Sequence, residues 1–130
     1  IGVKHDVKRV FDRADVFGAI KLLDAAQAVG HELVDVKQLK ADLLVFSGHK
    51  MFAPQGIGVL YGRYDLLDQF QPFLSGGDMI EFVEEQITTY ADLPERLEAG
   101  TQNVAGVLGL KTAIEYINVI GLDRIKKKKK

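Results

Sequence analysis

Three short apolar runs constrain the fold of this chain more than any other feature of its sequence. They cover residues 19–23, 42–46 and 56–62, and each has the length of a strand that is buried within a sheet. Apolar residues at helical spacing predict a helix over Asp6–Phe17 and a longer helix over Asn103–Ile120. This alternation is typical of an α/β fold with a short, mostly parallel sheet and flanking helices.

The remaining segments predict short or irregular structure. Short helices are expected over Asp35–Leu39 and Tyr64–Phe70, and a polar connection without strands over residues 79–90. Only three strands are convincing, fewer than in an average sheet. We therefore expect residues 1–125 to be a fragment of a larger domain, and Lys126–Lys130 to form a solvated tail.

Charge and composition exclude several classes of function. Five of the 17 basic residues are Lys126–Lys130, and without them 12 basic residues face 18 acidic ones. The body of the chain is therefore acidic, which argues against nucleic acid as a partner. There is neither an apolar run long enough to span a membrane nor a signal-peptide pattern, so we expect no membrane association and a cytoplasmic location.

The residue types also limit the chemistry. The sequence holds no cysteine, which excludes a disulfide, a thiolate metal site and a cysteine nucleophile within these residues. Its three histidines are scattered, so we expect no metal site. His5 and His31 are expected to be surface residues or helix caps rather than ligands.

Polar residues follow two of the predicted strands. Asp24 ends the first strand, with Gln27 three residues later, and Ser47-Gly48-His49-Lys50 follows the second. Ligands of open α/β sheets bind beyond the carboxyl ends of the strands. If the two strands are parallel neighbours, an acid and a lysine share one crevice.

An acid and a lysine in one crevice suit pyridoxal phosphate. This cofactor needs a partly buried lysine for its Schiff base and an acid beside its ring nitrogen. Ser47 and His49 can donate hydrogen bonds to the phosphate, and Gly48 allows the backbone to approach it. Such residues are also common at strand ends without any function, so spacing alone leaves a chance arrangement open.

Four consecutive blocks carry a clear family resemblance. DAAQAVGH, VFSGHKMFAPQGIGVLYG, SGGDMI and LEAGTQN resemble segments of the group II (SUF-type) cysteine desulfurases. These are pyridoxal phosphate enzymes of fold type I in the class V aminotransferase family. The resemblance extends from Ile1 to about Ile125 and implies a middle portion of the large, cofactor-binding domain, about a third of such an enzyme.

The resemblance implies a role for each matching residue on the ring side of the cofactor. Lys50 would form the Schiff base with the cofactor aldehyde and shuttle protons. Asp24 would pair with the pyridinium nitrogen, and Gln27 would hydrogen-bond the ring hydroxyl.

On the phosphate side, the resemblance assigns Ser47 and His49 to the phosphate group. Thr101 resembles a threonine that reaches the cofactor phosphate of the other subunit, which implies a homodimer. Two residues depart from the family pattern: Ala25 stands where a glycine is common, and Gln102 where a proline is common. Neither departure removes a donor or an acceptor from the implied site.

The implied parent enzyme removes sulfur from L-cysteine. Its products would be L-alanine and an enzyme persulfide for iron–sulfur cluster assembly, with a sulfur-acceptor protein of the SUF system as a possible partner. Because the chain has no thiol, we expect it to be inactive by itself. Selenocysteine lyase, kynureninase or another class V activity remains open, as does a non-catalytic isolated fragment.

Arg96 lies between Glu95 and Glu98 in the sequence. We expect it to form a surface ion pair with one of these glutamates, which would contribute little to stability. A role in binding substrate is the less favoured interpretation.

Overall fold

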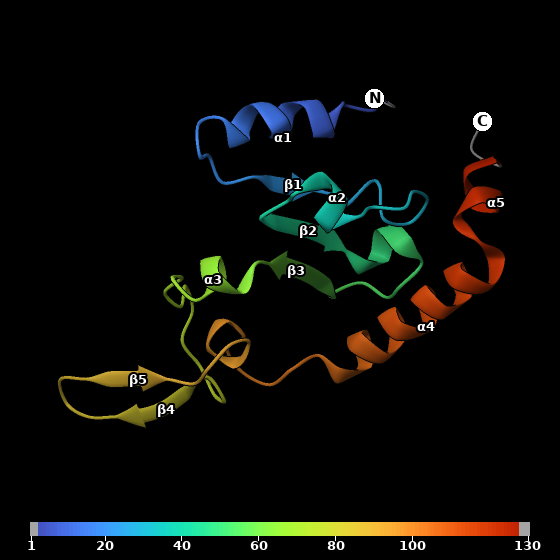
Figure 1. The fold of residues 1–130 in the computed structure, drawn as a ribbon. Helices are drawn as coiled ribbons and strands as arrows, with labels where there is room; N and C mark the ends of the chain where they lie inside the picture. Colours follow the sequence, from blue (N-terminus) through green and yellow to red (C-terminus); the bar gives the residue numbers. More distant parts are fainter. Residues whose placement is uncertain (1–2, 128–130) are drawn as a thin grey trace. The chain divides into compact units, whose positions relative to one another are not determined.

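The computed structural model describes residues 3–127, which form two compact units (Figure 1). The first unit comprises the described parts of Ile1–Gly62 and Ala105–Lys130, and the second comprises Arg63–Val104. The second unit is therefore an insertion in the sequence of the first. Each unit has a sheet of its own.

The three apolar runs form the sheet of the first unit. Its strands are β1 (Leu22–Asp24), β2 (Leu43–Ser47) and β3 (Gly58–Gly62), in the order β1-β2-β3 (Figure 1). β1 runs parallel to β2, whereas β3 runs antiparallel to it. A parallel return needs a crossover of about a dozen residues or more, and the connection over residues 48–57 is shorter than that. The α/β class is confirmed, and the sheet is mixed.

Two helices of the first unit begin at aspartate caps. α1 (Val7–Asp15) follows Asp6, whose carboxylate accepts the Arg9 backbone N–H at 3.1 Å. α2 (Val36–Leu39) lies between β1 and β2 in the sequence and follows Asp35, which accepts two backbone N–H groups of the first turn. Such caps satisfy N–H groups that have no partner within the helix, which explains why both helices begin where the sequence predicts.

A charged cluster lies where β1 and β2 begin, and we call it the Lys21 cluster (Asp15, Lys21, Lys40 and Asp42). Lys21 and Asp42 are buried, with 8% and 4% of their surface exposed. The Asp42 carboxylate accepts the Lys21 backbone N–H at 2.8 Å and lies 3.5 Å from the Lys21 ammonium. Asp15, at the end of α1, binds the Lys21 ammonium and lies 3.4 Å from that of Lys40. The cluster therefore joins α1 to the start of the sheet.

The charges of the Lys21 cluster stabilise one another. The hydrogen bond from Lys21 holds the pKa of Asp15 below its ordinary value, with a further contribution from Lys40. The same hydrogen bond raises the pKa of Lys21, and the negative charge of Asp42 adds to this effect. Both groups therefore stay charged over a wide pH range.

The longest helix, α4 (Val104–Ile120), packs on the segment that follows β2. The buried core cluster of the first unit consists of Met51, Ala53, Leu110, Ala113 and Ile117. Gly109 is needed for this contact, because a Cβ atom at that position would lie 2.5 Å from two ring carbons of Pro54. Gly121, with φ of +84°, follows the helix as the sequence predicts.

The last described element is α5 (Leu122–Lys127), which contains the first two lysines of the predicted tail. Lys126 Nζ lies 3.7 Å from Glu32 Oε1. These two lysines are therefore helical and one of them is paired, whereas Lys128–Lys130 lie outside the described residues.

The second unit corrects one expectation about secondary structure. Residues 79–90 do not form a strand-free connection, because β4 (Ile80–Val83) and β5 (Thr88–Tyr90) pair as an antiparallel hairpin. In β4, Ile80 and Phe82 alternate with other residues at the period of a strand. The glutamates around them give the segment a polar composition, which is why composition alone predicts a connection here. The unit also contains α3 (Tyr64–Leu67) and the 3₁₀ helix η2 (Glu95–Leu97).

Arg96 corrects a second expectation. Its guanidinium does not pair with a neighbouring glutamate but donates from Nη2 to both the backbone oxygen and the carboxylate of Asp68, each at 2.7 Å. Its side chain is only 18% exposed. Asp68 follows α3, so Arg96 satisfies polar groups at the end of that helix and joins two elements of the second unit.

Candidate active site

The parallel pairing of β1 and β2 brings the predicted polar residues to one edge of the sheet. Asp24, the last residue of β1, lies in register with Val45 of β2, and Ser47 ends β2 two residues later. The Ala25 backbone N–H donates to the Val45 carbonyl at 2.9 Å and so extends the pairing past the end of β1. Because both strands run in the same direction, their carboxyl ends meet at this edge.

A glycine fixes the turn after β1 against the segment after β2. Gly30 is buried, and a Cβ atom there would lie 2.9 Å from the Lys50 carbonyl oxygen and 3.2 Å from Met51 Cα. Val29 packs on the core cluster that contains Met51. The turn with Gln27 and the 3₁₀ helix η1 (Gly48–Met51) are therefore direct neighbours.

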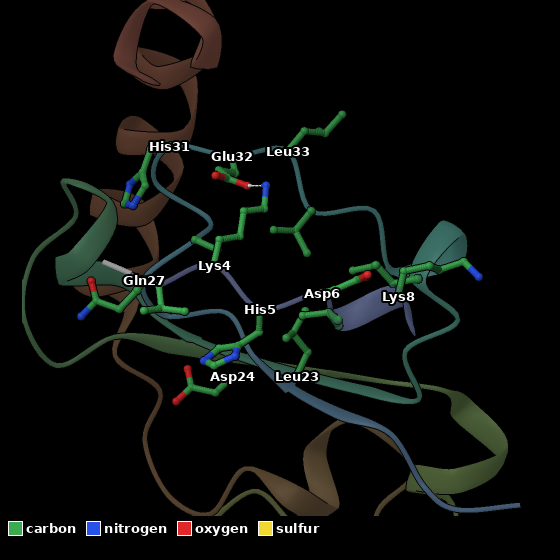
Figure 2. A pocket seen from close by; sticks show the side chains of 15 residues that line it. Lys4, His5, Asp6, Lys8, Leu23, Asp24, Gln27, His31, Glu32 and Leu33 are labelled. Atoms are coloured by element: carbon green, nitrogen blue, oxygen red, sulfur yellow. Dashed lines mark hydrogen bonds and ion pairs between the residues drawn. The ribbon is translucent and has the colours of Figure 1, made fainter. Parts of the chain in front are cut away.

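Asp24 and Gln27 line a groove of about 1280 Å³ (Figure 2). Both residues are exposed. Asp24 Oδ1 accepts the Ala26 backbone N–H at 2.9 Å, which fixes the orientation of the carboxylate. No other hydrogen bond or ion pair of Asp24 is found within residues 3–127, so its second oxygen is available to a ligand.

Ser47, His49 and Lys50 lie at the end of β2 and in η1. Ser47 Oγ and His49 Nδ1 are 2.8 Å apart, which leaves the other ring nitrogen of His49 for a ligand. Gly48 allows the tight turn, because a Cβ atom there would lie 2.7 Å from Ile57 Cγ2. Lys50 is exposed rather than partly buried, and its amine has no partner among the described side chains.

Five of the six predicted site residues therefore come together at one edge of the first unit. The sixth, Thr101, is exposed and belongs to the second unit, and its role remains a prediction.

Sequence reasoning missed the opposite wall of the groove. This wall is formed by residues 3–8, before and at the start of α1, and includes Lys4 and His5. Lys4 forms an ion pair with Glu32 across the groove (Figure 2). The hydrogen bond from Lys4 holds the pKa of Glu32 below its ordinary value, and Lys126 contributes to the same effect. No local pattern predicts a contact between residues so far apart in the sequence.

The donor set at this edge fits pyridoxal phosphate. Lys50 offers an accessible amine, Asp24 offers a free carboxylate oxygen, and Ser47 with His49 offers donors for a phosphate. These are the three kinds of group that the cofactor requires. A divalent metal is a poorer match, since no group of three or more His, Asp or Glu side chains within residues 3–127 is arranged to hold one.

None of the helices within residues 3–127 is long and apolar enough to span a bilayer.

The chain is similar to known proteins along nearly its whole length. The aminotransferase class-V family matches residues 1–130. A cysteine desulfurase of Serratia proteamaculans is 48% identical over 126 residues, which are 96% of this chain and 31% of that protein. The chain thus spans about a third of the length of this curated relative.

Solved structures give the same result. The apo cysteine desulfurase of Thermococcus onnurineus NA1 superposes with a TM-score of 0.91 at 49% identity, covering 97% of this chain and 32% of that one. SspA, solved in complex with cysteine, has a TM-score of 0.72 at 27% identity, covering 88% of this chain and 29% of that one.

Proposed function

The chain belongs to the class V aminotransferase family, and from this premise we propose that it is the cofactor-binding part of a cysteine desulfurase. The observation that carries the proposal is the parallel register of β1 and β2. It brings an acid and an unpaired lysine to the same edge of one sheet.

Each residue at this edge has a distinct part in holding pyridoxal phosphate. Lys50 Nζ would bind the aldehyde, and the free oxygen of Asp24 would hold a proton at the ring nitrogen. Gln27 would donate to the ring hydroxyl. A His49 ring that carries both of its protons would donate from Nδ1 to Ser47 Oγ and from its other ring nitrogen to the phosphate, and Ser47 Oγ–H would then donate to the phosphate as well.

Pyridoxal phosphate, when bound, supplies an aldehyde for amines and a ring that takes up electrons from the α-carbon of the substrate. Lys50 Nζ, in its neutral form, would accept the proton of that α-carbon and return it to the product. Asp24 would keep the ring nitrogen protonated throughout, which requires that its carboxylate stay in place. Its hydrogen bond from Ala26 supports this role.

L-cysteine is the proposed substrate, with L-alanine and a persulfide as products. The names of the relatives and the cysteine complex of SspA support this choice. The 130 residues hold no cysteine, so the persulfide has to form on a thiol outside them. We therefore expect no alanine release from L-cysteine by this chain alone.

The finer features of the proposal follow from the family resemblance. They are the SUF-type subgroup, delivery of sulfur to an acceptor protein for iron–sulfur cluster assembly, and a cytoplasmic location. A homodimer is proposed as well, in which Thr101 reaches the phosphate of the partner subunit's cofactor.

Trapping the cofactor on Lys50 tests the proposal. Pyridoxal phosphate is added to the chain, reduced with borohydride, and located by peptide mass spectrometry. We expect the label mainly on Lys50, because its exposed amine has no partner among the described side chains and the residue follows β2 at the edge that carries Asp24. Lys50→Ala should lose most of the label, whereas Lys37→Ala, which removes an exposed lysine on α2, should keep it. Equal labelling of the two variants would contradict the proposal.

A further inference from the structure

His5 is a histidine of the groove to which the proposed chemistry gives no role. It lies just before α1 and lines the groove together with Asp24 and Gln27. Figure 2 shows its imidazole and the Asp24 carboxylate turned toward the same corner, whereas His31 lies at another corner of the groove.

The backbone of His5 is held on both sides. Lys4, the preceding residue, is tied across the groove to Glu32. Asp6, the following residue, caps α1 by accepting the Arg9 N–H at 3.1 Å, and the His5 carbonyl accepts the Val7 N–H at 3.0 Å. A side chain between two such anchors has a limited range of positions.

The imidazole itself has no hydrogen bond or ion pair with any residue of the described range 3–127. It can therefore donate a hydrogen bond to a carboxylate or, when protonated, pair with it. The other charged groups that line the groove are Lys4, Asp6, Lys8 and Glu32. Lys4 pairs with Glu32, Asp6 caps its helix, and Lys8 pairs with Asp12 at 2.5 Å. Asp6 and Asp24 each accept one backbone N–H and keep a second oxygen without a partner within residues 3–127. Figure 2 shows the His5 ring on the side of Asp24 rather than of the Asp6 carboxylate. The second oxygen of Asp24 can accept two hydrogen bonds, one from His5 and one from the ring nitrogen of the cofactor.

We propose that His5 is a positioning residue, whose imidazole holds the Asp24 carboxylate in the orientation that binds the ring nitrogen of pyridoxal phosphate. This inference rests on the proposed function, because it acts through Asp24 on that cofactor. His5 does not touch the cofactor in this proposal. Its effect should therefore disappear whenever the contact between Asp24 and the ring nitrogen is absent.

A first experiment needs no cofactor. The imidazole NMR resonances of His5 and His31 are compared at one fixed pH in the wild-type chain and in Asp24→Asn. Removing the negative charge should shift the resonances of His5 and leave those of His31 in place. Resonances of His5 that do not move would overturn the proposal, even if the chain bound no cofactor at all.

A second experiment compares pyridoxal phosphate with its 1-deaza analogue, which lacks the ring nitrogen. His5→Ala should raise the dissociation constant for pyridoxal phosphate about two- to five-fold, as expected for an exposed polar pair. It should leave the dissociation constant for the analogue unchanged. His5→Asn keeps a hydrogen-bond donor at this position and should restore part of the lost affinity for pyridoxal phosphate. His31→Ala is the matched control and should bind both compounds like the wild type.

The outcomes separate this inference from the proposed function. If His5→Ala lowers the affinity for pyridoxal phosphate and for the 1-deaza analogue equally, His5 only supports the fold, and its positioning role is overturned. If binding of pyridoxal phosphate does not depend on Lys50, the proposed function fails, and the NMR comparison alone decides whether His5 faces Asp24.

Discussion

The two ends of the β1–β2 pair carry the same residue types in opposite states. At the amino end, Lys21 and Asp42 are buried and bound to each other. At the carboxyl end, Asp24 and Lys50 are exposed, and Lys50 has no partner among the described residues. An aspartate and a lysine thus stabilise the fold at one end, whereas at the other end they are exposed and form the pair that we propose to bind a ligand. Residue type does not distinguish the two ends, but the presence of charged internal partners does.

The largest expected difference between the two ends is in stability. Asp42→Ala removes the acceptor of the Lys21 backbone N–H and leaves a buried ammonium with one partner fewer. We expect this variant to lose about 3 kcal/mol of unfolding free energy in urea. Asp24→Ala, the matched change at the exposed end, should lose about 0.5 kcal/mol or less. Similar losses in the two variants would refute the comparison.

A smaller effect is expected where the carboxyl end depends on close backbone packing. Gly30→Ala places a Cβ atom 2.9 Å from the Lys50 carbonyl oxygen, so the turn and η1 have to separate. We expect a loss of about 1–2 kcal/mol in urea, together with weaker borohydride trapping at Lys50. Gly77→Ala is the control, because a Cβ atom there meets nothing within 4 Å. Unchanged trapping in Gly30→Ala would show that this contact does not position Lys50.

The smallest expected effect is the pH dependence of the Lys21 cluster, because Asp15 is one-third exposed. The pKa of Asp15 is lowered from 3.8, so its contribution is complete above that pH and is lost as the pH falls through the lowered value. The pKa of Lys21 is raised from 10.5, so its contribution is complete below that pH and is lost as the pH rises through the raised value.

The Tm of the wild type should therefore exceed that of Asp15→Asn between about pH 5 and 9, and the difference should vanish in strong acid. Subtracting the two Tm values at each pH removes the contributions that both proteins share. One of these comes from Asp65, because its hydrogen bond from Arg63 holds the pKa of that carboxyl below its ordinary value. Asp12→Asn, which breaks an exposed pair within α1, should have a Tm close to that of the wild type. A Tm difference that persists unchanged into strong acid would argue that Asp15 acts by packing rather than by charge.

The features that the sequence predicts correctly depend on local patterns. Asp6 and Asp35 cap helices through N–H groups two or three residues away, and apolar runs mark strands without knowledge of their partners. The prediction that Asp24 ends a strand likewise depends only on the residues next to it in the sequence. The meeting of two strand ends then follows from one assumption, that β1 and β2 are parallel neighbours, and the register confirms it.

The features that sequence reasoning missed depend on distant partners. The Lys21 cluster joins α1 to the beginnings of two strands, and Arg96 binds Asp68 from a later turn of the chain. His5 enters the groove only because residues 3–8 fold across it. A single sequence contains no signal for such contacts, since surface charges in the same pattern are usually solvated.

The ion pairs of Glu32 offer a way to follow the folding of the first unit. Glu32 pairs with Lys4 near the start of the chain and lies 3.7 Å from Lys126 near its end, although the whole second unit intervenes in the sequence. Dyes attached at residues 4 and 126 would therefore lie within efficient energy-transfer distance when the first unit is folded. A single fluorescence ratio would follow the assembly of this unit, independently of the inserted residues.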